Sequence, residues 1–211
     1  NAAQFVTGSL QGGAFFVISE QAQIDNLLIE NCHMLGDGLK NSYGITGKNP
    51  NATITVKNCS FTNLGYAIQT TSGGGYASLV VEACTFENIL SWAIMPQYGY
   101  SGDLTVNNCT FNTVSKGICI FNEGVNDFYL EVNDSEFVAS EKDDKAAIQM
   151  HTEKGIKGTV VINNTTATGF ADVNGGLWNE IVNSPDNIYG LPSQTPTNNF
   201  TIYVDDELAQ L

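Results

Sequence analysis

The sequence predicts an all-β solenoid, in which one short structural unit is stacked repeatedly on the next. Three observations support this fold class: an octapeptide recurs at intervals of 25 to 30 residues, apolar residues alternate within each copy, and helical spacing is absent. One unit cannot bury its apolar face alone, but units stacked roughly 4.8 Å apart share a continuous core. With 211 residues and 42% hydrophobic content, the chain is long enough for one such domain.

The octapeptide supplies the first predicted strand of each unit. In "LTVNNCTF", Leu104 and Val106 alternate with polar residues, and period two indicates a strand with one buried face. The six copies are "LLIENCHM" (27–34), "ITVKNCSF" (54–61), "LVVEACTF" (79–86), "LTVNNCTF" (104–111), "LEVNDSEF" (130–137) and "VVINNTTA" (160–167).

A second short strand is predicted shortly after each octapeptide. Its copies read "YGIT", "YAIQT", "WAIMP", "KGICI", "AAIQM" and, in degenerate form, "FADVN". One aliphatic residue occupies the same place in every copy, and we expect it to point inward. These residues are Ile45, Ile68, Ile94, Ile118, Ile148 and Val173.

Stacking the units places equivalent residues in columns along the solenoid. One column contains four of the five cysteines, Cys32, Cys59, Cys84 and Cys109, and the neighbouring column contains Met34, Phe61, Phe86, Phe111 and Phe137. We interpret the thiols as buried small hydrophobic groups. Disulfides between neighbouring units are the alternative, but the side chains would point in parallel rather than at each other.

Asparagines mark the bend after the first predicted strand. Asn31, Asn58, Asn108 and Asn164 directly precede the cysteine position, whereas Ala83 and Asp134 interrupt the series. Over about residues 14–175 the chain therefore resembles the right-handed parallel β-helix proteins of the pectate-lyase-like superfamily, which carry an asparagine ladder at this bend. The resemblance implies a single-stranded right-handed parallel β-helix of about 6 to 8 rungs of roughly 26 residues with capped ends.

We expect one domain over residues 1–211. Residues 1–13 are expected to form an N-terminal cap, residues 14–175 the rungs, and residues 176–211 a C-terminal loop, a last strand and a cap. In "NFTIYVDDELAQL" (199–211) we expect one last strand with Phe200, Ile202 and Val204 inward. A linker to another domain is the alternative for this segment.

Composition limits the partners. Acidic residues outnumber basic ones by 22 to 8, the net charge is -14, and arginine is absent. Such a surface repels nucleic-acid phosphates, and no apolar run is long enough to insert in a membrane. We expect a monomeric secreted or cell-surface protein, its leader peptide already removed, that contacts carbohydrate as an adhesin, binding module or accessory part of a larger surface protein.

The resemblance implies that ligands lie on the outward face of the second predicted strands and the loops beside them. Alternation turns Thr46, Met95 and Cys119 outward, together with the ligand contacts that we predict. Flat aromatic rings beside amides can stack on sugar rings and bind their hydroxyls. A solvated polar face without a ligand is the alternative. The predicted ligand contacts are Gln69, Gln97, Tyr98, Phe121, Gln149 and His151.

Catalytic and metal-binding signals are weak. Glu123 and Glu153 could lie one rung apart as a glycosidase carboxylate pair, and His151 could serve as acid or base. Asp143 and Asp144 in "SEKDDKAA" are candidate calcium ligands, although the lysines beside them offset their charge. No other cofactor is expected. The alternatives to a binding module are therefore a polysaccharide-active enzyme, a hydrolase sooner than a lyase, and a structural spacer without a ligand.

Overall fold

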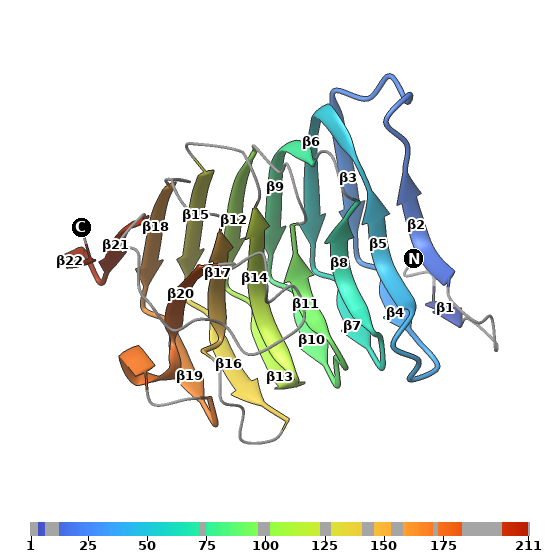
Figure 1. Ribbon diagram of the computed structural model, residues 1–211. Coiled ribbons are helices and arrows are strands. Elements are labelled where there is room, and N and C mark those ends of the chain that lie inside the picture. The colour runs from blue at the N-terminus through green and yellow to red at the C-terminus, as the bar shows by residue number, and fades with distance from the viewer. Residues whose placement is uncertain are drawn as a thin grey trace.

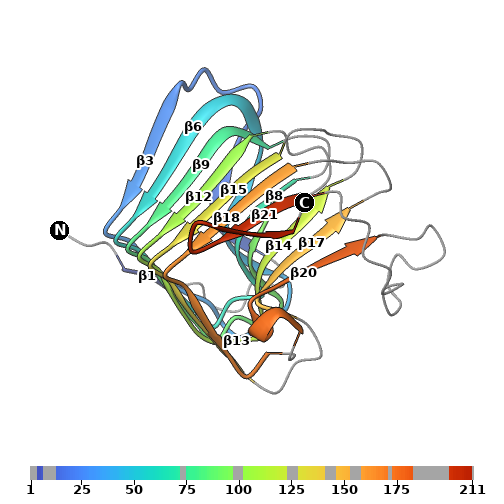
Figure 2. The same cartoon turned by 90° about the vertical axis from the view of Figure 1, so that its left-hand side faces the viewer.

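Three parallel sheets wind around one apolar interior in the computed structural model (Figure 1). The structure describes residues 4–6, 13–71, 75–96, 102–122, 128–140, 146–152, 158–170, 173–182 and 200–210. Within this part, successive coils follow one another along a single axis, and the turned view shows the three sheets as separate walls (Figure 2). The predicted all-β solenoid is confirmed.

We name the sheets by the position of their strands in each coil. The first-strand sheet contains β2 (Gly13–Ile18), β5 (Ser42–Gly47), β8 (Tyr66–Thr70), β11 (Trp92–Met95), β14 (Lys116–Asn122), β17 (Ile148–Thr152) and β20 (Trp178–Val182). The second-strand sheet contains β3 (Asn26–Glu30), β6 (Asn49–Lys57), β9 (Tyr76–Glu82), β12 (Asp103–Asn107), β15 (Phe128–Asn133), β18 (Gly158–Asn163), β21 (Phe200–Val204) and β22 (Glu207–Gln210). The third-strand sheet contains β1 (Gln4–Val6), β4 (His33–Leu35), β7 (Ser60–Thr62), β10 (Thr85–Glu87), β13 (Thr110–Val114), β16 (Glu136–Ala139) and β19 (Thr166–Thr168).

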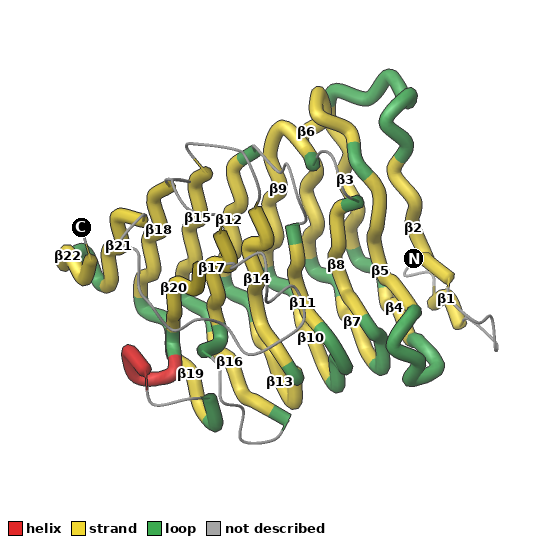
Figure 3. The backbone as a smooth tube through the Cα atoms, viewed as in Figure 1, coloured by secondary structure: helices red, strands yellow, loops and turns green. Residues whose placement is uncertain are grey.

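The strand register reproduces the sequence repeat. Phe61 pairs with Phe86, which pairs with Phe111, and the Phe137 partner Ala167 lies 30 residues further along the chain. The tube view shows how strands alternate with short bends throughout the described coils (Figure 3). Because Phe61, Phe86, Phe111 and Phe137 are direct register partners, their identical side chains stack on one another.

The interior consists of the predicted columns. The phenylalanine rings stack almost in parallel, with centroid distances of 5.0 Å for Phe61–Phe86, 4.5 Å for Phe86–Phe111 and 4.2 Å for Phe111–Phe137. Ile45, Ile68, Ile94, Ile118 and Ile148 are all buried in the core, as predicted. This stacked apolar core is the main source of stability, because dispersion and burial both favour it.

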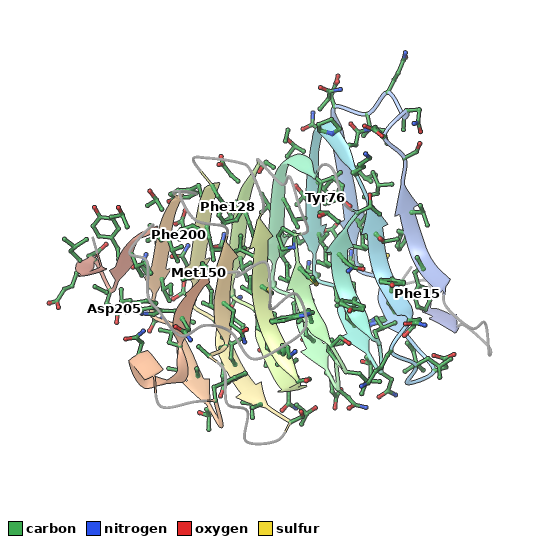
Figure 4. All side chains as sticks on the ribbon, in the orientation of Figure 1. Phe15, Tyr76, Phe128, Met150, Phe200 and Asp205 are labelled. Carbon is green, nitrogen blue, oxygen red and sulfur yellow. The ribbon has the colours of Figure 1, made fainter. Side chains whose placement is uncertain are left out.

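A further interior column alternates aromatic rings with glycine. Gly158 pairs with Phe128 on one side and Phe200 on the other. A Cβ atom added at Gly158 would lie 2.5 Å from Cε1 of Phe200 and 2.6 Å from the Phe128 oxygen. The rings therefore use the space that the glycine leaves, and Figure 4 shows Tyr76, Phe128 and Phe200 following one another along the solenoid.

The asparagine bend is explained by its backbone conformation. Asn31, Asn58, Asn108 and Asn164 all have a φ angle between 44° and 55°, in the left-handed region that asparagine tolerates better than most residues. Ala83 and Asp134 adopt the same conformation with φ of 51° and 50°. The predicted asparagine ladder is confirmed as a column of left-handed turns, and Ala83 is the member least suited to it.

Substituting Ala83→Asn is expected to stabilise the fold by about 1 kcal/mol, because alanine pays a steric cost in the left-handed region and asparagine pays less. Asn58 and Asn108, with φ of 50° and 52°, carry out the same role one coil away on either side. Urea unfolding measures the change. The exposed Ala77 in β9, whose φ is not positive, is the control site; an equal gain from Ala77→Asn would contradict the conformational explanation.

Two expectations towards the C-terminal end of the chain need correction. Within residues 199–211, the described residues 200–210 form two antiparallel strands, β21 and β22, rather than one, because Asp205 and Asp206 (φ 50° and 65°) reverse the chain in a tight turn. Phe200 and Ile202 are buried as predicted, whereas Val204 is only half-buried.

The degenerate copy "FADVN" also differs from its prediction. Val173 begins a short 3-10 turn (Val173–Gly176) in which Asn174 and Gly175 have positive φ angles, so the chain cannot stay extended there. The strand of this coil is β20 instead, and Trp178 takes the place expected for Val173 by pairing with Ile148. Within residues 1–13, β1 pairs with β4 in the third-strand sheet, and the N-terminal cap expected there stays a prediction.

Candidate functional site

A column of aromatic side chains lies outside the core where the first-strand sheet begins. It consists of Tyr43 in β5, Tyr66 in β8 and Trp92 in β11, in register with one another, and Lys116 in β14 follows. All four side chains are partly exposed. The Tyr43 and Tyr66 rings stack with centroids 5.3 Å apart and an interplanar angle of 12°, and Lys116 Nζ lies 4.6 Å from the Trp92 ring centroid. We call these three rings the aromatic column.

Small buried residues hold the aromatic column at the surface. Each ring is followed by a residue without a bulky side chain, as with Gly44 after Tyr43 and Ala67 after Tyr66, and both are buried. A Cβ atom at Gly44 would lie 2.7 Å from Cδ1 of Phe61. The strand therefore packs directly against the phenylalanine column, and the ring before it has no room inside.

The two phenol groups of the column are available to a ligand. Among the described residues, the side-chain hydroxyls of Tyr43 and Tyr66 have no hydrogen-bond partner. Neither hydroxyl oxygen is among the buried polar atoms that lack a partner. Burial of the ring, with a smaller contribution from Tyr66, raises the pKa of Tyr43 above its usual value. Tyr43 is therefore neutral at pH 7, and its hydroxyl can both donate and accept.

Amide side chains flank the column at the corner between two sheets. Asn63 and Asn88 precede β8 and β11, have φ of 54° and 53°, and are partly or fully exposed. Asn88 Nδ2 donates a hydrogen bond to Asn63 Oδ1, which leaves the remaining amide groups directed at solvent. Phenols, an indole and amides thus lie along one edge of the solenoid at the spacing of the coils.

The predicted stripe of exposed glutamines is covered at two of its positions, Gln69 and Gln149. Gln69 is 8% exposed and Gln149 is fully buried, so the expectation of an open stripe is wrong at these positions. Gln69 Nε2 contacts Met95 Sδ at 3.8 Å, and Gln149 Nε2 donates to the Ala146 oxygen at 2.9 Å. Both amides are used inside the protein because burial requires a partner for each polar group.

The outward direction of this stripe nevertheless agrees with alternation. Met95 and Cys119 lie between the two glutamines in register and are buried, yet neither belongs to the interior core cluster. They face away from the interior and are covered on the outside. Alternation in the sequence predicts whether a side chain points inward or outward, but not whether another segment covers it. This explains why these outward side chains are buried although we expected them to be exposed.

The remaining predicted site residues stay predictions. Gln97, Tyr98, Glu123, Glu153, Asp143 and Asp144 lie outside the described residues. Phe121 and His151 are paired across β14 and β17, but only their backbone is described. Tyr76 is the first residue of β9 and is 1% exposed, and burial raises the pKa of its hydroxyl.

The cysteine column has no disulfide. All five cysteines are free, and Cys59, Cys84 and Cys109 are buried. A hydrogen bond between the Cys84 and Cys109 thiols raises the pKa of Cys84 to about 12 and lowers the pKa of Cys109. Because these thiols are free and buried, the interpretation as small buried hydrophobic groups is confirmed for Cys59, Cys84 and Cys109 over the disulfide alternative.

The described part of the chain contains neither a metal-ion cluster nor a membrane-spanning helix. No group of three histidine, cysteine, aspartate or glutamate side chains there could hold a metal ion. No helix among those residues is long and apolar enough to cross a membrane.

The three parallel sheets make this protein a β-solenoid, and the aromatic column lines one side of it. The model of the family described as "right handed beta helix region" matches residues 6–166, and the chain belongs to this family. The coils are therefore right-handed, consistent with a pectate-lyase-like right-handed β-helix protein. No curated protein and no solved structure matches the chain significantly.

Sequence reasoning missed the aromatic column, although a signal for it was present. In the first-strand sheet, the segments "YGI", "YAI", "WAI" and "KGI" each start with a large side chain at one shared position. This position directly precedes the small residue that comes before the inward isoleucine. Strict alternation assigns this position to the interior, on the same side as isoleucine. The close approach of the strand to Phe61, which only the packed structure reveals, turns it outward.

Proposed function

We propose that this protein is a secreted or cell-surface module that binds carbohydrate along the aromatic column. The observation that carries the proposal is the regular array of Tyr43, Tyr66 and Trp92, partly exposed and one coil apart. Tyrosine and tryptophan combine a flat apolar ring with a polar tip, which suits sugar rings that have apolar faces and hydroxyl rims. An oligosaccharide lying along the solenoid axis would meet one hydrogen-bonding ring in each coil.

The contacts that we propose follow from how the rings are stacked. Tyr43 and Tyr66 use their facing sides on each other, and Lys116 covers a face of Trp92. The register partner of Tyr43 on its other side is Ala14, which has no ring. We therefore expect one sugar ring to stack on the outer face of Tyr43. Further sugars would hydrogen-bond the phenols and the corner amides of Asn63 and Asn88.

Charge favours neutral glycans. The chain carries a net charge of -14 and no arginine, so a polyanionic glycan is repelled at long range and lacks a bidentate partner. Lys116 is the basic side chain in register with the column, and its ammonium already lies over Trp92.

Binding to immobilised neutral and acidic oligosaccharides, followed by calorimetry on the best ligand, tests the proposal. We expect Tyr43→Ala, which removes the proposed stacking ring, and Tyr66→Ala, which removes a proposed hydrogen-bonding phenol, each to weaken binding at least about tenfold, roughly 1.4 kcal/mol or more. The matched control is Tyr203→Ala, which removes a 36% exposed tyrosine from β21. Wild-type affinity in the two column variants, or the absence of any bound glycan, would contradict the proposal.

Mass spectrometry of the same oligosaccharides after long incubation separates binding from cleavage. Intact oligosaccharides are expected from a binding module. Shorter products that disappear in a Glu123→Gln, Glu153→Gln double variant would assign the protein to the polysaccharide-active enzymes instead.

A further inference from the structure

The aromatic column repeats at a distance that the coils themselves fix. Its members are direct register partners in β5, β8 and β11, and Lys116 continues the line in β14. Backbone hydrogen bonding holds neighbouring parallel strands about 4.8 Å apart, and the Tyr43 and Tyr66 ring centroids lie 5.3 Å apart. The column and Lys116 therefore offer a ligand one position in each of four successive coils, at almost constant intervals.

The column is also straight. The interior rings of the coils that carry Tyr66, Trp92 and Lys116 are almost parallel to one another. Their interplanar angles are 3° for Phe61–Phe86 and 6° for Phe86–Phe111. The two tyrosine rings of the column are tilted by only 12°. Successive coils are thus barely rotated against one another, and a ligand that follows the column over several coils must itself be a straight chain.

A second polar column runs beside the first, at the corner before these strands. It consists of Asn63, Asn88 and Thr113, whose φ angles are 54°, 53° and 50° and whose side chains are at least partly exposed. We call these three residues the corner column. Asn88 N donates a hydrogen bond to Thr113 Oγ1 at 3.1 Å, and the hydroxyl proton of Thr113 is left for another acceptor. Each of three successive coils thus combines a ring or an ammonium group with a corner amide or hydroxyl.

The hydrogen-bonding groups of the two columns suit a chain whose sugars alternate in orientation. In an extended (1→4)-β-linked pyranose chain every second sugar is turned over, so successive sugars present opposite edges to one surface. Phenol hydroxyls, threonine hydroxyls and amides both donate and accept hydrogen bonds, so they can bind either edge. The hydroxyls of Tyr43 and Tyr66, which have no partner among the described residues, are therefore suited to successive sugars.

We propose that the aromatic column and the corner column bind an extended, neutral (1→4)-β-linked glycan along the solenoid axis, with one sugar in each coil. This inference rests on the proposed carbohydrate binding and adds the linkage and the shape of the ligand. The length of one sugar in such a chain is close to the spacing of parallel strands, so sugars and coils stay in step. A (1→4)-α-linked glucan winds into a helix and a (1→3)-β-linked glucan curves, so their successive sugars leave the line of the columns.

Isothermal titration calorimetry of the full chain with three glucose oligomers of equal length tests the linkage. The oligomers differ only in being (1→4)-β-, (1→4)-α- or (1→3)-β-linked. Oligomers of mannose, xylose and N-acetylglucosamine with the (1→4)-β linkage are added, so that the choice of sugar does not decide the result. We expect at least one (1→4)-β-linked oligomer to bind at least about tenfold more tightly than both oligomers of other linkage.

The outcomes separate this inference from the proposed function. Equal or tighter binding of an oligomer of another linkage would overturn the inference, and carbohydrate binding itself would stand. Binding of none of the oligomers would overturn the inference as well, and the immobilised glycans described above then show whether the protein binds any carbohydrate.

Chain length and one hydroxyl locate the contact. Affinity is expected to rise with the length of the (1→4)-β-linked oligomer until the chain spans the column, because each added sugar meets one more coil. Tyr66→Phe keeps the stacked ring, removes one hydroxyl and is expected to weaken binding several-fold. The matched control Tyr203→Phe makes the same change on the 36% exposed tyrosine of β21 and should leave binding unchanged. An affinity that does not depend on chain length, or wild-type affinity in Tyr66→Phe, would contradict one sugar in each coil.

Discussion

Replacing Phe111 by alanine is expected to destabilise the protein by about 3–5 kcal/mol, the range for a large aromatic ring removed from a packed core. Phe111 is 0% exposed and stacks between Phe86 at 4.5 Å and Phe137 at 4.2 Å. Its loss leaves a cavity that two coils share. Because each coil of a solenoid is stabilised by its neighbours, both contacts of the central coil are weakened at once.

Denaturant unfolding measures this effect, and hydrogen exchange shows where it acts. The control Tyr203→Ala removes a partly exposed ring of similar size from β21 and is expected to cost less than about 1 kcal/mol. We expect faster exchange in β10, β13 and β16, which carry the stacked rings. If Phe111→Ala lowered the free energy of unfolding as little as the control does, the interior would have to relax and fill the gap. That result would contradict the description of a stacked column.

Gly47→Ala is expected to cost more than about 3 kcal/mol and to disturb the pairing of β2 with β5. Gly47 has a φ of 120°, and an added Cβ atom would lie 2.1 Å from the Ile18 oxygen and 2.7 Å from the Ile18 nitrogen. Both contacts are with backbone, so the neighbouring strand itself must move. The substitution therefore combines conformational strain with a clash that no side-chain rotation can relieve.

Gly38→Ala separates these two effects. Gly38 also has a positive φ, 79°, but an added Cβ atom there would have no neighbour within 4 Å. Only the conformational cost remains, about 1–2 kcal/mol. Thermal unfolding of the two variants measures the difference. Equal destabilisation would show that close approach to Ile18 contributes nothing beyond the backbone conformation.

Most of the fold could be predicted from the sequence because its determinants are local and repeated. Alternation at Leu104 and Val106 indicates a strand, and the asparagines at the bend suit a left-handed turn that few other residues tolerate. Repetition then stacks like residues on like, which is why the phenylalanine and cysteine columns were both correctly predicted. The predictions for the C-terminal hairpin and for the degenerate copy at Val173 were wrong, because neither segment has a second copy that could reveal its turn.

The candidate site depends on packing between coils and could be predicted only in part. Alternation correctly directed Gln69 and Gln149 away from the core, but it cannot show that both are covered, since cover comes from segments distant in the sequence. Strict alternation would also place Tyr43 and its column partners on the interior side, like the isoleucine two residues on. Gly44 brings β5 so close to Phe61 that the ring is excluded from the core.

The repeat in this sequence determined by itself the all-β class, the coil period and the interior columns, because each coil repeats the same local preferences. Only the tertiary structure decided which outward side chains reach solvent and which aromatic rings align outside the core. Those properties depend on distances between coils and on how neighbouring segments cover each face, and a single strand pattern contains neither.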